Sequence, residues 1–495
     1  MRNNLFDNMV YSASNPIFFT SGLFLVLFAL FLFLYSFIYN KKTARNIYII
    51  LFSLYFYYKT SGDFVIVLLG TIVVNYIIAI QISNTDFKNL KRLSYLLGLS
   101  SNIFMLVYFK YFNYITSSIN QIFNGNLSSV DIIFPIGISF FTFQSISYLT
   151  DVFRNNVKPA NNILDYAFFV SFFPYIVAGP IVRASDMLPQ IKGNAIINKS
   201  DINTGLWLIY RGLIKKGIFS YYISQYCDLI FASPQNYSGV ENFISIIGYS
   251  IDIYLDFSGY SDIAIGVSSI LGFKIKPNFN NPYQAKNIID FWKRWHISLS
   301  TWLRDYLFLP LNYFYIRHSS KEKHYLLYAY IFATIFTMLI GGLWHGAENK
   351  YLLWGAFHAI GLCINRTYFY IVSKKIRGHF SIKFLGRVLT IIFLLVSWTI
   401  FRANNIEEAF FIINLVIRDF NLEFISPFFS ARTLFTFMLI TSLVLIYMSN
   451  VIKNKICDAF KLSPVYIKTV IFIVIIQIMV QIQTDSIQPF IYYQF

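Results

Sequence analysis

Ten long apolar runs, separated by short basic or turn-forming segments, dominate this sequence. They cover residues 17–39, 64–82, 96–115, 132–152, 167–182, 325–343, 351–372, 384–401, 434–448 and 466–482. A helix that crosses a bilayer needs roughly 20 mostly apolar residues, and a spanning segment must satisfy its backbone hydrogen bonds internally. A shorter run at 47–58 and two interrupted runs at 202–222 and 244–271 raise the predicted total to about 11–13 membrane segments, some of them re-entrant. The sequence therefore predicts one all-α integral membrane domain.

Composition excludes the main soluble classes. Charged residues make up 13% of the chain and hydrophobic residues 56%, whereas a soluble domain has about 25% and about 45–50%. A soluble enzyme, a secreted disulfide scaffold and a disordered chain are therefore excluded. The net charge of +17 does not indicate nucleic-acid binding, because the basic residues fall in short groups between apolar runs. The three cysteines form no CxxC pair, so neither a disulfide framework nor a thiolate metal site is predicted.

Basic residues in the short loops predict the orientation of the chain. Lys and Arg are enriched on the cytoplasmic side of membrane proteins, and here they gather at 41–45, 88–92, 374–387 and 453–468. The more acidic segment 402–432 is predicted on the opposite side. The resulting alternation places the N-terminus and the C-terminus outside the cytoplasm.

Residues 273–324 break the pattern of simple loops, because they combine many cations with three tryptophans. By charge and placement, Lys293, Arg294 and Arg304 are candidates for binding a phosphate-rich donor. Amphipathic helices in the inner interface would bury the tryptophan faces and leave the cations in water. The alternative is that this basic platform is an interfacial anchor and nothing more.

His345 lies among small residues between two apolar runs, in the segment Gly341–Ala347 (GGLWHGA). Ionisable side chains at membrane depth usually face a cavity or a partner, and glycines let a substrate approach closely. A neutral imidazole accepts a proton at physiological pH. His345 is thus a candidate general base, and a hydrogen-bonded structural histidine is the alternative.

Other ionisable residues have weaker signals. His296 sits within the basic platform, and His358 follows His345 by 13 residues, which is not the spacing of one helix face. No metal site is predicted. Asp256 and Asp262 interrupt an apolar run. They could line a polar tunnel, pair with platform cations, or pair with a Lys or Arg that fixes the position of the helix. The structural pairing is expected for Asp262, and all three remain open for Asp256.

Several motifs, in this order, resemble the membrane-bound O-acyltransferase family. They are FPIGISFFTFQ (134–144), AGPI (178–181), YLDFSGYSD (254–262), NNPY (280–283), FWKRWHISLSTWLRDYLFLPL (291–311) and GGLWHGA (341–347). The similarity is greatest to the bacterial branch typified by the membrane subunit of alginate O-acetyltransferase. Relatives often have Trp where this chain has Asn349 and Gly where it has Ala359, so contacts with partner or substrate nearby are expected to differ.

The resemblance implies a polytopic fold around a central tunnel in a bacterial inner membrane. It implies that His345 is the essential histidine and His296 the second motif histidine, with Asp256 and Trp344 as tunnel candidates. An acyl group would arrive from a cytoplasmic thioester, with acetyl-CoA the expected donor and no bound cofactor, and would leave on a hydroxyl at the outer face.

The last residues resemble the F-x-Y-x-x-F acyl-relay tail of teichoic-acid D-alanylation systems and alginate-type relatives. By that match residues 1–484 form the membrane domain and 485–495 an extracytoplasmic tail, with Tyr492 the acceptor between its anchors Phe490 and Phe495. An interfacial aromatic belt is the alternative. The relay implies an SGNH-type extracellular transferase as partner.

The sequence thus predicts a membrane O-acyltransferase, most simply an O-acetyltransferase, acting on a cell-surface or exported polysaccharide. Three alternatives remain open. The cargo could be D-alanine for a teichoic-acid-like polymer, the protein could be a lipid-modifying member of the family, or it could transport a lipid-linked oligosaccharide without a covalent step.

Overall fold

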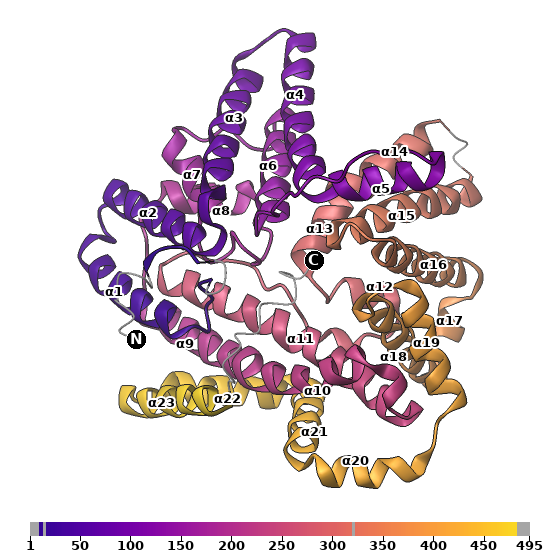
Figure 1. The fold of residues 1–495 in the computed structure, drawn as a ribbon. Coiled ribbons are helices and arrows are strands. Elements are labelled where there is room, and N and C mark those ends of the chain that lie inside the picture. Colours follow the sequence, from indigo (N-terminus) through magenta and orange to yellow (C-terminus); the bar gives the residue numbers. More distant parts are fainter. Residues whose placement is uncertain (1–8, 13–15, 319–321, 483–495) are drawn as a thin grey trace. The chain divides into compact units, whose positions relative to one another are not determined.

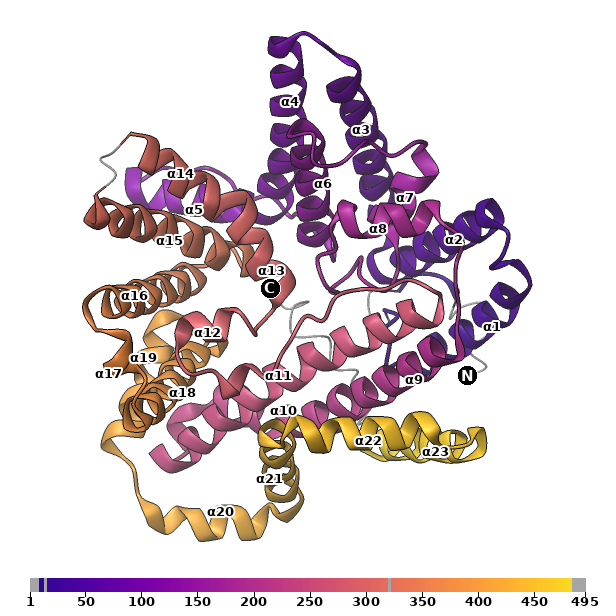
Figure 2. The same ribbon diagram turned by 180° about the vertical axis from the view of Figure 1, so that it is seen from behind.

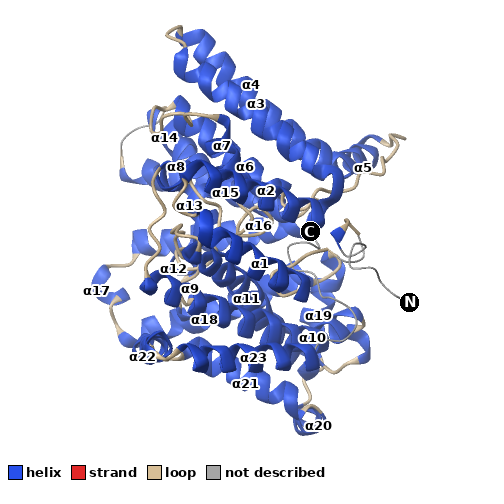
Figure 3. Ribbon diagram, turned by 90° about the vertical axis from the view of Figure 1, so that its left-hand side faces the viewer, coloured by secondary structure: helices blue, strands red, loops and turns tan. Residues whose placement is uncertain are grey.

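A computed structural model describes residues 9–12, 16–318 and 322–482. Throughout these ranges the regular structure is helical and contains no strand, as Figure 3 shows. The prediction of an all-α protein is confirmed. The chain divides into two compact units, each of which is described by itself.

Unit 1 comprises residues up to 209 together with 260–276. Its α-helices are α1 (Gly22–Ile38), α2 (Lys42–Ser61), α3 (Val65–Asn84), α4 (Lys88–Leu106), α5 (Phe112–Phe123), α6 (Ile138–Phe153), α7 (Ile163–Ser171), α8 (Ala184–Lys192) and most of α9 (Lys199–Leu213). Short turns η2 (Gly62–Phe64) and η3 (Val107–Tyr111) connect α2 to α3 and α4 to α5. In Figure 1, α3 and α4 form an antiparallel pair that packs against α6.

Unit 2 comprises residues 210–259 and those from 277 onward. Its α-helices are α10 (Tyr221–Ala232), most of α11 (Gly239–Ile270), α12 (Ile288–Trp292), α13 (Ile297–Leu303), α14 (Leu309–Arg317), α15 (Lys323–His345), α16 (Asn349–Ile371), α17 (Lys374–Arg377), α18 (Phe380–Arg402), α19 (Ile406–Arg418), α20 (Ile425–Ala431), α21 (Thr433–Tyr447), α22 (Asn450–Leu462) and α23 (Val465–Ile482). Its shorter helical turns are η4 (Ile214–Ser220), η5 (Pro234–Asn236), η6 (Pro282–Gln284), η7 (Arg304–Phe308) and η8 (Leu422–Phe424). Figure 2 shows α12, α16 and α18 gathered on one side of this unit.

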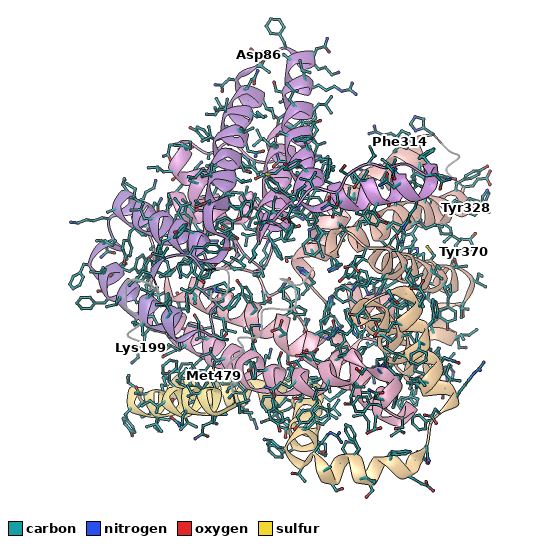
Figure 4. All side chains as sticks on the ribbon, viewed as in Figure 1. Asp86, Lys199, Phe314, Tyr328, Tyr370 and Met479 are labelled. Carbon is teal, nitrogen blue, oxygen red and sulfur yellow. The ribbon has the colours of Figure 1, made fainter. Side chains whose placement is uncertain are left out.

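Five helices in the described part of the chain are long and apolar enough to cross a membrane. They are Lys42–Asn84, Lys88–Phe123, His324–His345, Phe380–Arg402 and Val465–Ile482, and a sixth is counted if the sharply bent pair Leu422–Ala431 and Thr433–Tyr447 is one span. Large side chains on the outside of unit 2, such as Phe314, Tyr328 and Tyr370, extend away from their helices (Figure 4) and are exposed. Exposed apolar side chains are expected where lipid is the solvent.

The predicted span at 167–182 is wrong, and the one at 132–152 begins late. The helix α7 ends at Ser171 and turns follow, because Pro174, Gly179 and Pro180 cannot continue it. Helix α6 begins at Ile138, since Gly137 before it has a φ of +80°. A Cβ atom at Gly137 would lie 2.6 Å from the carbonyl oxygen of Ile176. Both the positive φ and this close contact therefore require glycine at position 137.

Two of the three tryptophans of the basic platform at 273–324 are buried inside the protein, and Trp292 is half-buried. Trp295 and Trp302 are buried inside unit 2, on the loop before α13 and within α13. The Trp295 ring lies 4.9 Å from that of Trp398 and 5.1 Å from that of Phe279. Aromatic packing within the protein therefore replaces the lipid contact predicted from amphipathicity, while Lys293 remains exposed.

Candidate active site

His345 is the last residue of α15 and is enclosed by aromatic rings. It is 4% exposed. The imidazole centroid lies 4.9 Å from the ring of Trp344, 4.9 Å from that of Trp354 on α16 and 5.2 Å from that of Phe401 on α18. All three rings meet the imidazole edge to face, an arrangement that aromatic pairs favour. Three helices thus hold one imidazole in an apolar enclosure.

Small residues bring α15 and α16 close enough to form this enclosure. A Cβ atom at Gly342 would collide with the carbonyl oxygen of Tyr351 and would lie 3.1 Å from the Cα atom of Gly355. The two helices therefore approach with no side chain between them, the small-residue packing typical of membrane helices. Gly342 is one turn before His345 and Gly355 follows Trp354, so the close approach places the imidazole against the indole.

His296 lies in a tight turn immediately before α13. Its φ of +39° is left-handed, a conformation uncommon for residues other than glycine. Its Nδ1 lies 3.3 Å from Oδ1 of Asn278, and the Ser298 hydroxyl donates to the same oxygen at 2.9 Å. The Ile297 amide also donates to the Asn278 carbonyl oxygen at 2.8 Å, which fixes the turn. The His296 imidazole is fully buried, and the loss of its hydration lowers its pKa to about 3. The imidazole is therefore neutral at physiological pH.

Trp344 connects the two motif histidines. Its ring centroid lies 4.9 Å from that of His345 and 6.0 Å from that of His296. On the other side of His296, the Phe257 ring of α11 lies 4.6 Å away in an edge-to-face contact. The structure therefore brings His296, Trp344 and His345 into one continuous cluster, as expected for residues of one site.

A third buried histidine, for which no role was predicted, adjoins this cluster. His358 packs 4.5 Å, centroid to centroid, from Trp354, which also contacts His345. Trp354 and His358 are four residues apart on α16, so helical spacing was the signal that connects them. The 13-residue spacing between His345 and His358 does not indicate that the two are neighbours, because they are connected through Trp354 and not by a direct helical contact.

Asp256 forms a buried ion pair with Lys216, which lies outside the basic platform. Lys216 belongs to η4, a π-helical segment between α9 and α10. One turn earlier on α11, Asp252 accepts a hydrogen bond of 2.6 Å from the Ser220 hydroxyl of the same segment. Of the alternatives open for Asp256, this ion pair matches the structural one, in which a Lys or Arg partner fixes the helix position, and the partner comes from outside the platform. Asp262 is a buried residue of unit 1.

The platform cations differ in their surroundings. The Arg294 guanidinium donates to Asp290 at 2.9 Å and to the Asn280 carbonyl oxygen at 3.3 Å, so it helps to hold its own loop. Arg304 donates to Asp305 at 2.8 Å and is largely exposed. Lys293 is exposed. The geometry thus leaves Lys293 and Arg304 more accessible to a soluble anion than Arg294.

The tail residues Phe490, Tyr492 and Phe495 lie outside the described residues. Within the described ranges, no group of three or more His, Cys, Asp or Glu side chains is arranged to hold a metal ion. The predicted tunnel also remains a prediction.

The chemistry available at the cluster is proton transfer. Neutral imidazole is both a proton acceptor and, on its other nitrogen, a donor. An apolar aromatic enclosure excludes bulk water, which strengthens electrostatic interactions with a reacting group and suppresses hydrolysis of a reactive intermediate. Such a site suits a group transfer that needs proton transfer in the absence of water.

The fold and the cluster together define an all-helical membrane protein with a buried histidine site, and sequence comparison identifies the family. Residues 87–407 match the membrane-bound O-acyltransferase family, and the chain belongs to it. The matched region contains all three buried histidines. The predicted family, fold class and enzyme class are thereby confirmed: the protein is a multi-pass membrane acyltransferase.

Named relatives share most of the chain. A peptidoglycan O-acetyltransferase of Helicobacter pylori is 36% identical over 391 residues, covering 74% of this chain and 72% of the relative. A probable alginate O-acetylase AlgI of Pseudomonas aeruginosa is 35% identical over 397 residues, covering 79% and 73%. A teichoic acid D-alanyltransferase of Bacillus subtilis is 33% identical over 227 residues, covering 46% and 57%.

Proposed function

We propose that this protein is an O-acetyltransferase of the bacterial inner membrane that serves the acetylation of a cell-surface or exported polysaccharide. The observation that carries the proposal is His345, a buried histidine in a water-poor aromatic enclosure of a membrane acyltransferase. Support for the cargo comes from the relatives with the longer alignments, which are named as O-acetylating proteins of peptidoglycan and alginate.

In the proposed reaction, His345 takes the proton of the attacking hydroxyl as its oxygen bonds to the acetyl carbon of the thioester. The carbon–sulfur bond then breaks, and the same proton passes from the imidazole to the leaving thiolate. General-base catalysis of this kind contributes roughly 10²–10⁴-fold in rate. The donor would be acetyl-CoA from the cytoplasm, and Lys293 and Arg304 are the more accessible candidates for its phosphates, with Arg294 a structural contributor to the same loop.

D-alanine is the second candidate cargo. It is favoured by the similarity to teichoic acid D-alanyltransferases, which extends over less than half of this chain. A lipid-linked oligosaccharide transporter and a lipid-modifying enzyme have no comparable support, because the family is one of acyltransferases and these relatives are named for polymers.

The cargo is tested by chemical analysis of the cell envelope. We expect a deletion strain to lose alkali-labile acetate from its surface polysaccharide and to regain it with the wild-type gene, while ester-linked D-alanine stays constant. Acetate would be measured by ion chromatography and D-alanine by chiral chromatography after mild base treatment. Loss of D-alanine in place of acetate would assign the protein to the second cargo, and loss of neither would refute acylation of a surface polymer.

We further propose that Tyr492 receives the acetyl group from the thioester and presents it, between Phe490 and Phe495, to an SGNH-type transferase outside the cell. The tail would then be extracytoplasmic. We expect Tyr492→Phe to abolish polysaccharide acetate with an unchanged amount of protein in the membrane, because only the phenolic oxygen is removed. Tyr493→Phe is the matched control and should retain product. Normal acetate in the Tyr492→Phe strain would eliminate the relay.

A further inference from the structure

Both ring nitrogens of His358 are engaged by side chains of other elements. The indole N–H of Trp292 on α12 lies 3.3 Å from Nδ1, and the Ser397 hydroxyl oxygen on α18 lies 2.7 Å from Nε2. His358 itself is on α16 and is 0% exposed. A single buried imidazole therefore joins three separate helices of unit 2 by hydrogen bonds.

The donor at Nδ1 fixes the protonation of this imidazole. An indole nitrogen can only donate, so Nδ1 must be the unprotonated nitrogen and the proton must be on Nε2, which then donates to Ser397. A buried polar group that loses its partner incurs a desolvation penalty. The arrangement consequently selects one tautomer and one ring orientation for His358.

Trp354 contacts both His358 and His345. The centroid of its indole lies 4.5 Å from that of His358 and 4.9 Å from that of His345. The Trp398 ring stacks at 6.4 Å and the Phe401 ring lies at 5.5 Å, so the indole is packed on further sides. Close packing of this kind passes a displacement of one side chain to the next.

We propose that His358 is a positioning residue that orients His345 through Trp354. In this role His358 contacts neither the acyl donor nor the hydroxyl that accepts the acyl group. Held by Trp292 and Ser397, it keeps the Trp354 indole against one side of the catalytic imidazole, and without it the indole can rotate and the imidazole loses its alignment with the hydroxyl and the thioester. This inference rests on the proposed function, in which His345 is the general base.

The test uses variants that separate the two hydrogen bonds. His358→Phe keeps a planar ring and removes both bonds. His358→Asn retains an acceptor near the Nδ1 position and thus the bond from Trp292, whereas His358→Gln retains a donor near the Nε2 position and thus the bond to Ser397.

Trp292→Phe and Ser397→Ala remove the partners one at a time and leave the imidazole in place. Thr390→Val is the matched control, because the buried Thr390 hydroxyl lies on the same helix as Ser397 and donates to the Gly386 carbonyl oxygen of that helix at 2.6 Å.

Each full-length variant would be assayed in membranes for transfer from radiolabelled acetyl-CoA. Because misplacing a reacting group by 1 Å costs roughly 10²-fold, we expect kcat for His358→Phe to fall by roughly 10- to 100-fold. We expect KM for acetyl-CoA to stay within about twofold of wild type, since no donor contact is lost. The Asn and Gln variants should recover part of kcat. Ser397→Ala should lower kcat in the wild type but add nothing to His358→Asn, where its partner is already gone.

Several results would overturn the inference. They are a wild-type kcat in His358→Phe, a loss expressed only in KM, or equal losses in Thr390→Val and Ser397→Ala. If His358→Phe fails to reach the membrane, the Trp292→Phe and Ser397→Ala variants decide the matter, and wild-type kcat in both refutes it. Absence of transfer by the wild-type protein is a separate outcome that rejects the proposed function itself.

Discussion

Replacing His345 by alanine is expected to eliminate acetate from the surface polysaccharide of a complemented deletion strain. The His345 imidazole, enclosed by Trp344, Trp354 and Phe401, is the proposed proton acceptor, and alanine offers no group that accepts a proton. Loss of general-base catalysis lowers the rate by roughly 10²–10⁴-fold. Alkali-labile acetate, measured at equal abundance of the two proteins in the membrane, reports the change.

The control for His345→Ala is His379→Ala, which removes an exposed imidazole immediately before α18. We expect this variant to restore wild-type acetate. Should His345→Ala restore acetate as well as the wild type does, His345 is a structural histidine and the proposed mechanism is wrong. Should both histidine variants fail at equal abundance, the loss reflects a general sensitivity of the protein and not the chemistry of one site.

The all-helical fold could be predicted from sequence because the constraint is local. Each apolar run must satisfy its own backbone within lipid, whatever its neighbours do. The prediction failed where local hydropathy was not the deciding property. Residues 167–182 are apolar enough for a span, but most of them are buried within the protein. The helix ends at Ser171, before Pro174, and residues 172–182 form turns and loop.

The position of His345 in the site could be predicted, but not its surroundings. Its motif of glycines and Trp344 is contiguous in sequence, whereas Trp354 and Phe401 come from two further helices and reach the imidazole only through tertiary packing. The contacts of His358 could not be predicted for the same reason, because its partners Trp292 and Ser397 are 66 and 39 residues away in sequence. Spacing within one helix could have related Trp354 to His358, but nothing local relates either to His345.

Asp256 shows a different limit of sequence reasoning. A carboxylate in an apolar run predicts a cationic partner, and the structure supplies Lys216 in place of a platform cation. Lys216 reaches it from the π-helical segment η4, which changes the direction in which that stretch of the helix presents its side chains. At Gly259, which contacts the same segment, a Cβ atom would lie 3.0 Å from the Lys216 amide nitrogen. Neither feature leaves a signature in hydropathy.

Breaking the pair between Lys216 and Asp256 is expected to destabilise unit 2 strongly. Removing one partner of a buried ion pair is strongly destabilising, typically by about 3–5 kcal/mol. Asp256→Asn and Lys216→Met should each lower the midpoint of thermal unfolding in detergent. The double variant Lys216→Met with Asp256→Leu should recover much of the loss, because a well-packed apolar pair of similar volume is often as stable as the ions it replaces.

The exposed pair of Lys276 and Asp186 in unit 1 provides the comparison, with nitrogen and oxygen 2.7 Å apart and the lysine side chain 79% exposed. Lys276→Met should cost no more than about 1 kcal/mol, as surface pairs do.

Asp256 also precedes Phe257, whose ring packs on His296. We therefore expect the single variants to lose kcat along with stability. If the double variant is no more stable than the worse single variant, the cost arises from other contacts of these residues and not from an uncompensated charge.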